Sequence, residues 1–273
     1  MVATPIGNLA DITLRALHVL QLADTLACED TRHSQALLRA YGIDKPAAHW
    51  LALHQHNEAQ AAQTVLERLQ AGQRVAYVSD AGTPGISDPG ARLAAAVASA
   101  GLRVVPLPGA SSITAALSVA GAAASGADDS GFVFAGFLPT KAGAVQRLQA
   151  EPRCCVLLEA PHRIAALAAT LAALGERPVT LARELTKQFE QITTLPAAAL
   201  AGWLQQDPLR CRGEFVVVLH PVAASADQAQ GLDVLQRLLQ ELPLKSAVRL
   251  AADITGVPRN QLYEAALALK AGA

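Results

Sequence analysis

Short apolar runs alternate with stretches of helical spacing through the first half of the chain, and this alternation restricts the fold more than any other feature. The chain has 273 residues, and the apolar runs lie at 25–30, 48–54, 74–80 and 102–109. Strand–helix alternation of this kind is typical of a parallel sheet covered by helices on both faces. The sequence therefore predicts an N-terminal α/β domain over residues 1–122.

The second half is predicted to form another α/β domain, over residues 123–222, after a linker of small and acidic residues at 121–131. The run GEFVVVLH is apolar almost throughout, which favours a central, buried strand. A second linker at 224–231 precedes three short amphipathic patterns, which predict a helical tail module over 231–273. Strands are expected at 154–160, 178–184 and 213–220, and helices are expected to start near Pro161 and Pro196.

Composition limits the partners and the compartment. The net charge is −1, so a nucleic-acid partner must be met by a local basic face. The four cysteines show no spacing typical of zinc ligands, so no metal is predicted and a reducing cytoplasm is expected. The start of the chain lacks the pattern of a signal peptide, and the most membrane-like window, 109–126, is short of large apolar residues. No membrane partner is predicted.

The loop VSDAGTPGISDPG at 78–90 directly follows an apolar run. Open α/β sheets bind ligands at the carboxyl ends of their strands. Glycines let a ligand approach the backbone, and prolines make the turn rigid beforehand. The loop is acidic, which disfavours a phosphate loop; Asp80 or Asp88 can accept hydrogen bonds from hydroxyls or an amine instead. The alternative is a tight turn whose aspartates cap backbone groups, with Asp88 preceding a helix.

Three other clusters follow predicted strands. PGASS at 108–112 places two hydroxyls at a helix start, where a capping serine is the alternative explanation. CEDTRHS at 28–34 gathers charges at a strand end, and its alternative is a helix capped by Asp30 or Thr31. LARELTKQFE at 181–190 carries Glu184 and Lys187, and its alternative is the start of a surface helix.

Eight motifs in this order closely resemble a known family: TPIGNLADIT, EDTR, LHQHNE, VSDAGTPGISDPG, VVPLPG, GFLPTK, LARELTK and GEFVVVLH. The chain resembles the bacterial small-subunit ribosomal RNA methyltransferases of the tetrapyrrole methylase superfamily. These enzymes methylate the ribose 2′-oxygen of a cytidine in the decoding centre. The resemblance covers essentially the whole chain, including the C-terminal helices.

The resemblance implies two α/β domains of the tetrapyrrole-methylase type, with S-adenosylmethionine in the cleft between them, and a homodimer. It implies that the loop after 74–80 holds the methionine end of the cofactor. The expected cofactor-binding residues come from segments 80–88, 108–112 and 182–184, with Ala182 near the adenine. They are Asp80, Gly82, Thr83, Ile86, Ser111, Ser112, Ala182 and Glu184.

Methyl transfer to a hydroxyl needs alignment, a base and stabilisation of the alkoxide. Asp30 and Glu29 are candidate bases, Arg32 a candidate phosphate anchor and Lys187 a candidate alkoxide stabiliser. Two other functions stay open: a methylase of a corrin or porphyrin precursor, and a non-catalytic ribosome-assembly factor.

The tail favours the RNA substrate, because sparse cations and an aromatic suit RNA contacts, although the same helices can simply dimerise. A near-neutral protein suits the assembled small subunit, where shape can replace charge. The tail residues concerned are Lys245, Arg249, Arg259, Tyr263 and Lys270.

Overall fold

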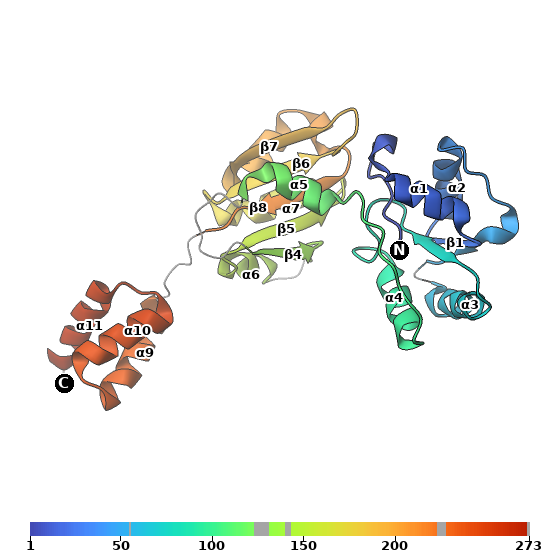
Figure 1. Ribbon diagram of the computed structural model, residues 1–273. Helices are drawn as coiled ribbons and strands as arrows, with labels where there is room; N and C mark the ends of the chain where they lie inside the picture. The colour runs from blue at the N-terminus through green and yellow to red at the C-terminus, as the bar shows by residue number, and fades with distance from the viewer. Residues whose placement is uncertain (55, 123–130, 140–142, 223–227, 272–273) are drawn as a thin grey trace. The chain divides into compact units, whose positions relative to one another are not determined.

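The computed structural model describes residues 1–54, 56–122, 131–139, 143–222 and 228–271. The chain divides into two compact units, Met1–Val222 and Ala223–Ala273. The first unit contains two sheets and the second contains only helices (Figure 1). The predicted boundary between two α/β domains adjoins residues 123–130, which lie outside the described part, and it stays a prediction.

The first sheet is parallel, as predicted. Its strands are β1 (Thr25–Cys28), β2 (Trp50–Ala52) and β3 (Val75–Val78), in the order β2-β1-β3. Parallel strands place their carboxyl ends at one edge, so the residues that follow β1, β2 and β3 emerge together.

Helices cover both faces of this sheet. On one face, α1 (Leu14–Leu22) and α2 (Thr31–Ala40) pack against Leu26 and Cys28. On the other face, α3 (Glu58–Gln70) and α4 (Gly90–Ser99) pack in the same cluster as Ala27 and Tyr77. Because neighbouring strand residues face opposite sides, burial on both sides requires continuous apolar runs. The prediction of a doubly covered sheet is confirmed.

The strand predicted at 102–109 is wrong. Only Leu107 forms a bridge, to Val2, which also bridges Val78 of β3. Pro106 and Pro108 lack the N–H groups that a longer ladder needs. The first residues of the chain therefore lie between β3 and the segment around Leu107, and they close this side of the sheet.

The second sheet has five strands in the order β4-β5-β8-β6-β7. The central position of β8 confirms the prediction from GEFVVVLH, whereas β4 and β7 were not among the predicted strands. β4 pairs parallel with β5, and the pairings β5–β8, β8–β6 and β6–β7 are antiparallel. The strands are β4 (Phe132–Gly136), β5 (Cys154–Glu159), β6 (Pro178–Arg183), β7 (Gln191–Pro196) and β8 (Phe215–Leu219).

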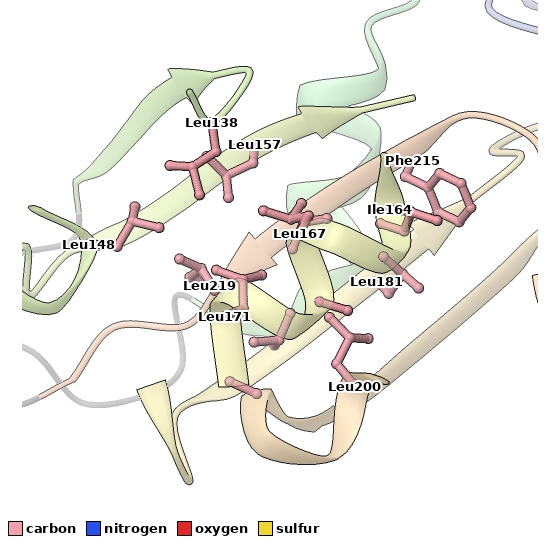
Figure 2. Packing of buried hydrophobic residues seen from close by; sticks show 14 of the residues in the cluster. Leu138, Leu148, Leu157, Ile164, Leu167, Leu171, Leu181, Leu200, Phe215 and Leu219 are labelled. Carbon is pink, nitrogen blue, oxygen red and sulfur yellow. The ribbon is translucent and has the colours of Figure 1, made fainter. Parts of the chain in front are cut away.

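This sheet also carries an apolar cluster on each face. Phe215 and Leu219 of β8 pack with α7 (Ile164–Leu171) and α8 (Leu200–Gln205), as Figure 2 shows for α7. Val216 and Val218 face the opposite side, where α5 (Ser112–Ala120) packs. The helices expected near Pro161 and Pro196 are α7 and, after the short turn Ala197–Ala199, α8.

The remaining elements of this unit are one short α-helix and five 3₁₀ turns within the described residues. They are α6 (Ala144–Ala150) and the turns Leu9–Asp11, Ala47–His49, Ala172–Leu174, Ala197–Ala199 and Pro208–Cys211.

The second unit has its own apolar core, as expected for a helical tail module. Its helices are α9 (Gln228–Glu241), α10 (Leu244–Thr255) and α11 (Arg259–Ala271), and Leu235, Ala251 and Leu262 are buried between them. The linker predicted at 224–231 is wrong from Gln228 onward, because α9 begins there. Gly231 lies inside α9 and allows close packing: a Cβ atom there would lie 2.6 Å from Val257 Cγ2. None of the described helices is long and apolar enough to cross a membrane.

Candidate cofactor and substrate site

The carboxyl-terminal edge of the first sheet brings two of the predicted segments together. Glu29 and Asp30 follow β1, and Asp80 follows β3. The backbone N–H of Asp30 donates to Asp80 Oδ1 at 3.2 Å, so the two segments are hydrogen-bonded to each other. Thr83 Oγ1 donates to the carbonyl of Ala110 at 3.0 Å, which joins the loop after β3 to the loop before α5.

These segments line a cavity of 210 Å³, which we call the acidic lobe. Seven of the residues proposed from the sequence lie in its wall: Glu29, Asp80, Gly82, Thr83, Ile86, Ser111 and Ser112. Asp88 completes the group of carboxylates that gives the lobe its name. The described wall contains no lysine or arginine, so the site suits a cationic ligand rather than a phosphate.

Asp88 fixes the shape of the loop after β3. Its Oδ1 accepts from the hydroxyl of Tyr77 at 2.9 Å and from the N–H of Gly90 at 2.8 Å, and its Oδ2 accepts from the N–H of Gly85 at 2.7 Å. Burial and the nearby Asp88 carboxylate raise the pKa of Tyr77, which keeps its hydroxyl a donor. Asp88 therefore does cap backbone N–H groups, but it is not the N-cap with Pro89 as the first helical residue, because α4 begins at Gly90 and Pro89 is its N-cap. The buried Tyr77 hydroxyl holds the Asp88 carboxylate, and with it the loop, in place.

Gly82 brings the backbone itself to the cavity wall. Its φ is 81°, a conformation that favours glycine. Its N–H donates to the carbonyl of Thr4 at 3.1 Å and its carbonyl accepts from Thr4 at 3.0 Å. A Cβ atom would lie 3.2 Å from Ile6 Cγ2. The N-terminal segment thus holds this turn tightly against the site.

Ser111 precedes the first turn of α5, but its side chain makes no capping hydrogen bond. The capping explanation is therefore wrong for this hydroxyl. Ser111 and Ser112 both line the acidic lobe, and the side chain of neither donates or accepts a hydrogen bond within the described residues. Both hydroxyls are left for a ligand.

A second cavity, of 330 Å³, adjoins the first, and we call it the large lobe. Both lobes are lined by Ile6, Ala81, Ser87, Ser112 and Leu158, so they share a wall. The second sheet contributes Ala182 and Val216 to the large lobe, together with Phe137, Glu159, Lys187 and Glu214. Ala182 therefore lines the large lobe, and its expected position near the adenine stays a prediction. Ser112, which follows the loop before α5, lines both lobes.

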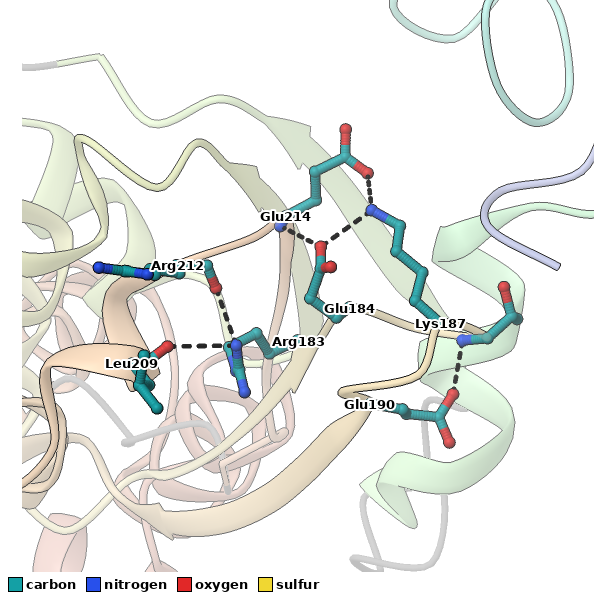
Figure 3. A network of polar contacts seen from close by, with 8 residues as sticks. Arg183, Glu184, Lys187, Glu190, Leu209, Arg212 and Glu214 are labelled. Carbon is teal, nitrogen blue, oxygen red and sulfur yellow. Dashed lines mark hydrogen bonds and ion pairs between the residues drawn. The ribbon is translucent and has the colours of Figure 1, made fainter.

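Lys187 is held by two carboxylates at the large lobe, as Figure 3 shows. Its Nζ lies 2.9 Å from Glu184 Oε1 and 3.0 Å from Glu214 Oε2. Partial burial alone would lower the pKa of Lys187, but the hydrogen bonds to the two glutamates outweigh it and raise the pKa. Lys187 is therefore a fixed cation, suited to stabilising negative charge and unsuited to accepting a proton. Glu184 does not line either lobe and acts on the site through Lys187.

The segment that carries Lys187 has an unusual backbone. Glu184 and Thr186 have φ of 53° and 65°, the two positive values among the described non-glycine residues. A helix start at 181–190 is therefore wrong: β6 ends at Arg183 and the chain turns into β7. Gly7 packs so closely on this turn that a Cβ atom there would overlap the side chain of Lys187. Such strain concentrates at functional sites.

Asp30 and Arg32 lie outside both lobes. Asp30 is the N-cap of α2 and accepts from the N–H of Arg32 at 2.8 Å, which confirms it, rather than Thr31, as the cap. The Arg32 side chain is 90% exposed and pairs with Asp30 at 3.0 Å. Hydrogen bonds from Arg32, through its side chain first and its backbone second, lower the pKa of Asp30 to about 2. A carboxylate with that pKa is a weak base.

Glu29 differs from Asp30 in each of these respects. It lines the acidic lobe, and its carboxylate makes no hydrogen bond or ion pair with the described residues. Partial desolvation, and then the charges of Asp80 and Asp88, raise its pKa above the ordinary value. A free carboxylate with a raised pKa facing a cavity is the better candidate for a base.

Sequence reasoning missed Glu159, at the end of β5. This carboxylate is buried, lines the large lobe and pairs with Arg163 at 3.3 Å. The signal was present, because a lone acidic residue ends the apolar run CCVLLEA in the same way that Glu29 ends TLACE. Treating every acidic residue at the end of a predicted strand as a candidate site residue would have found Glu159.

The comparisons with known proteins agree with this arrangement. The model of the family Tetrapyrrole (Corrin/Porphyrin) Methylases matches residues 1–201, so the chain belongs to that family. A second model, the RsmI C-terminal HTH domain, matches residues 225–270. The predicted fold class and superfamily are confirmed.

Relatives that match almost the whole chain share a more specific name. Ribosomal RNA small subunit methyltransferase I of Pseudomonas aeruginosa is 47% identical, over 98% of this chain and 95% of its own length. The enzyme of the same name from Escherichia coli O157:H7 is also 47% identical, over 98% of this chain and 93% of its own length.

Solved structures support the fold. A cobalt precorrin-4 methyltransferase of cobalamin biosynthesis matches with a TM-score of 0.57 at 19% identity, over 80% of this chain and 92% of its own. A diphthine synthase matches with a TM-score of 0.57 at 16% identity, over 80% of this chain and 88% of its own.

Proposed function

We propose that the chain transfers a methyl group from S-adenosylmethionine to the ribose 2′-oxygen of a cytidine in the decoding region of small-subunit ribosomal RNA. The observation that carries this proposal is the extent of the matches. Relatives named as small-subunit ribosomal RNA methyltransferases align with 98% of the chain, whereas the cobalt precorrin-4 enzyme covers 80%. The tail module has its own family match. Methylation of a tetrapyrrole precursor would not explain why the tail module is present.

The charge of the acidic lobe and the glycine in its wall support S-adenosylmethionine as the ligand. The glycine turn at Gly82 leaves room for a ligand at the backbone, and a Cβ atom would crowd Ile6 there. The carboxylates of the acidic lobe complement an ammonium group and a sulfonium. The bound cofactor supplies an electrophilic methyl group. The proposed cofactor residues are Asp80, Gly82, Thr83, Ile86, Ser111, Ser112 and Ala182. Glu184, which lines neither lobe, is proposed to position Lys187 instead of contacting the cofactor.

The chain's own residues supply the remaining chemistry. Glu29 is proposed to accept the proton of the ribose hydroxyl as the oxygen attacks, because it is the free carboxylate with a raised pKa in the acidic lobe. Asp30 holds the start of α2, next to Glu29, in place. Arg32, exposed beside this site, is proposed to contact an RNA phosphate with its guanidinium.

Lys187 is proposed to stabilise the negative charge that develops on the ribose oxygen. Replacing it by methionine keeps the aliphatic stem that packs near Gly7 but removes the charge. We expect the single-turnover methylation rate to fall about 10²-fold, the lower range for losing such a stabilising donor. Calorimetric affinity for S-adenosylmethionine should change little.

Glu214→Gln is the matched control for this variant. It removes one of the two carboxylate partners and leaves the lysine in place with Glu184. We expect a much smaller loss of rate in this control. Equal losses in the two variants would show that the ion-pair network, rather than the ammonium group, matters.

The substrate is proposed to be the assembled small subunit, bound by a homodimer. The decisive assay offers labelled S-adenosylmethionine with undermethylated small subunits, protein-free ribosomal RNA, or a tetrapyrrole precursor. Label on the subunits, at the cytidine ribose, is the expected result. Label on the tetrapyrrole would refute the proposal, and cofactor binding without label on any substrate would favour the assembly factor.

The tail module provides a separate prediction about recognition. It has its own core, so deleting residues 223–273 should leave residues 1–222 folded and able to bind cofactor. Methylation of small subunits should require a roughly tenfold higher subunit concentration, the effect of losing about 1.4 kcal/mol of binding.

Two readouts distinguish recognition from assembly. Unchanged half-saturation by subunits would exclude the tail from recognition. A shift from dimer to monomer in light scattering would assign the helices to dimerisation instead.

A further inference from the structure

An exposed aromatic ring lies at the large lobe and has no role in the mechanism above. Phe137 lines this cavity, yet 48% of its surface is exposed. Three of the five phenylalanines are exposed, and of these Phe137 lines the large lobe, whereas Phe132 and Phe189 line neither lobe. Because a large apolar side chain gains free energy by burial, a ring left half open at a cavity rim suggests a ligand that covers it.

The backbone on both sides of Phe137 is fixed. Gly136 ends β4 with a φ of 65°, which turns the chain out of the strand. Leu138 is 7% exposed and belongs to the apolar cluster beneath the sheet, as Figure 2 shows. Arg163 Nη2 donates to the carbonyl of Leu138 at 2.6 Å, and the same guanidinium pairs with the buried Glu159. The ring is thus attached to a rigid support and costs little to position.

We propose that Phe137 stacks on the base of the substrate nucleotide when its ribose reaches the junction of the two lobes. This inference rests on the proposed RNA methylation. Proteins that recognise single-stranded RNA stack its unpaired bases on aromatic side chains, and the ring then replaces the stacking that the base has lost. A phenyl ring has no hydrogen-bonding group, so this contact would hold the nucleotide without selecting its base.

The cofactor's adenine is the other flat group that could cover this ring, and the cavity already offers it a different surface. Ala182 and Val216 are 1% and 4% exposed and form an apolar wall of the large lobe on adjacent strands β6 and β8. Phe137 comes from a different part of the sheet, at the end of edge strand β4, and remains half open. The ring is therefore placed for a ligand that enters from outside.

The test compares Phe137→Ala with Phe132→Ala in the full-length protein. Phe132 is the matched control, because it begins the strand β4 that Phe137 directly follows, is 49% exposed and does not line the cavity. Single-turnover methylation is measured against small-subunit concentration at saturating S-adenosylmethionine. Phe137→Ala should raise the half-saturating subunit concentration roughly 5- to 150-fold, the range for losing one base–aromatic stack. Phe137→Trp should stay near the wild-type value, and Phe132→Ala should be unchanged.

Calorimetry with S-adenosylmethionine alone distinguishes stacking of Phe137 on the substrate base from stacking on the cofactor's adenine. Unchanged cofactor affinity in Phe137→Ala is expected; a weakened affinity with normal subunit dependence would assign the ring to the adenine and overturn the proposal. Equal behaviour of Phe137→Ala and Phe132→Ala would also overturn it. If the alanine variant melts early, Phe137→Leu keeps apolar bulk without the ring and should show the same loss. A wild-type protein that labels no subunit would refute the proposed function itself, before any variant is compared.

Discussion

Replacing Gly82 by valine should abolish binding of S-adenosylmethionine while the protein stays folded. Gly82 has a φ of 81°, which a β-branched residue adopts only at a cost. The new Cβ atom would lie 3.2 Å from Ile6 Cγ2 and 3.7 Å from the carbonyl oxygen of Ala110. Ile6 lines both lobes, and the carbonyl of Ala110 holds Thr83, so the branched side chain would disturb the cavity from two sides.

Gly101→Val provides the control for backbone strain. Gly101 has a φ of 73° and no atom within 4 Å of the position of a Cβ, and it follows α4 and lines neither lobe. Both variants should lose a similar amount of stability, about 1–2 kcal/mol for a left-handed residue. Thermal melts measure this loss and calorimetry measures cofactor affinity. Wild-type affinity in a folded Gly82→Val protein would refute the cofactor site proposed here.

Replacing Glu29 by glutamine should lower the single-turnover methylation rate roughly 10²–10⁴-fold, the usual contribution of a general base. The amide keeps the shape of the side chain but cannot accept the proton. Because Glu29 must be ionised to act, the rate in the wild type should rise with pH through its raised pKa and then level off. The glutamine variant should lose that rise.

Asp30→Asn is the matched control, one residue along the chain. Asparagine still accepts the capping bonds from α2, and the pKa of Asp30, about 2, already makes it a weak base. We expect nearly full activity and a small change in melting temperature. Full activity in Glu29→Gln together with a large loss in Asp30→Asn would reverse the two assignments.

Glu29→Gln should slow methylation but stabilise the folded protein at neutral pH. The pKa of Glu29 is higher in the folded state than in the unfolded state. Its favourable contribution to the free energy of unfolding is therefore fully present below the unfolded-state pKa and is lost as the pH rises through the folded-state pKa. At neutral pH the ionised carboxylate is repelled by Asp80 and Asp88. Glu29→Gln should therefore melt at a higher temperature than the wild type at neutral pH, and this advantage should vanish in acid. A lower melting temperature at neutral pH would contradict this account.

The sequence predicted strands well where burial alone decides them. GEFVVVLH became the centre of its sheet because both of its faces are covered by apolar clusters. The run at 102–109 looked equally apolar, but its two prolines cannot donate to a ladder, and its partner is the distant N-terminal segment. β7 was missed because it is an edge strand whose residues alternate between exposed and partly buried. A partner far away in the sequence decided the first case, whereas β7 pairs with the preceding strand β6 and lacks only the continuous burial that marks a central strand.

Candidate site residues were found where a glycine loop or a charge cluster follows a strand, because strand ends meet at one edge of a sheet. Glu29 and Asp30 show the limit of that reasoning. They are adjacent and chemically alike, and only the fold shows that Glu29 faces a cavity while Asp30 caps a helix. Phe137 was missed for a related reason, since an exposed ring in an apolar run looks like any other core residue.

The pairing of the first residues with the middle of the unit has a consequence for the order in which the site can be assembled during synthesis. Residues 2–4 are synthesised before their partners Val78, Gly82 and Leu107. The turn at Gly82 stays without its support from Thr4 until the two segments meet, and the loop before α5 is synthesised later still. A nascent chain that ends before Ser112 therefore lacks one wall of both lobes. The capacity to hold the cofactor is acquired late, after residues 2–4 have met partners that are synthesised well after them.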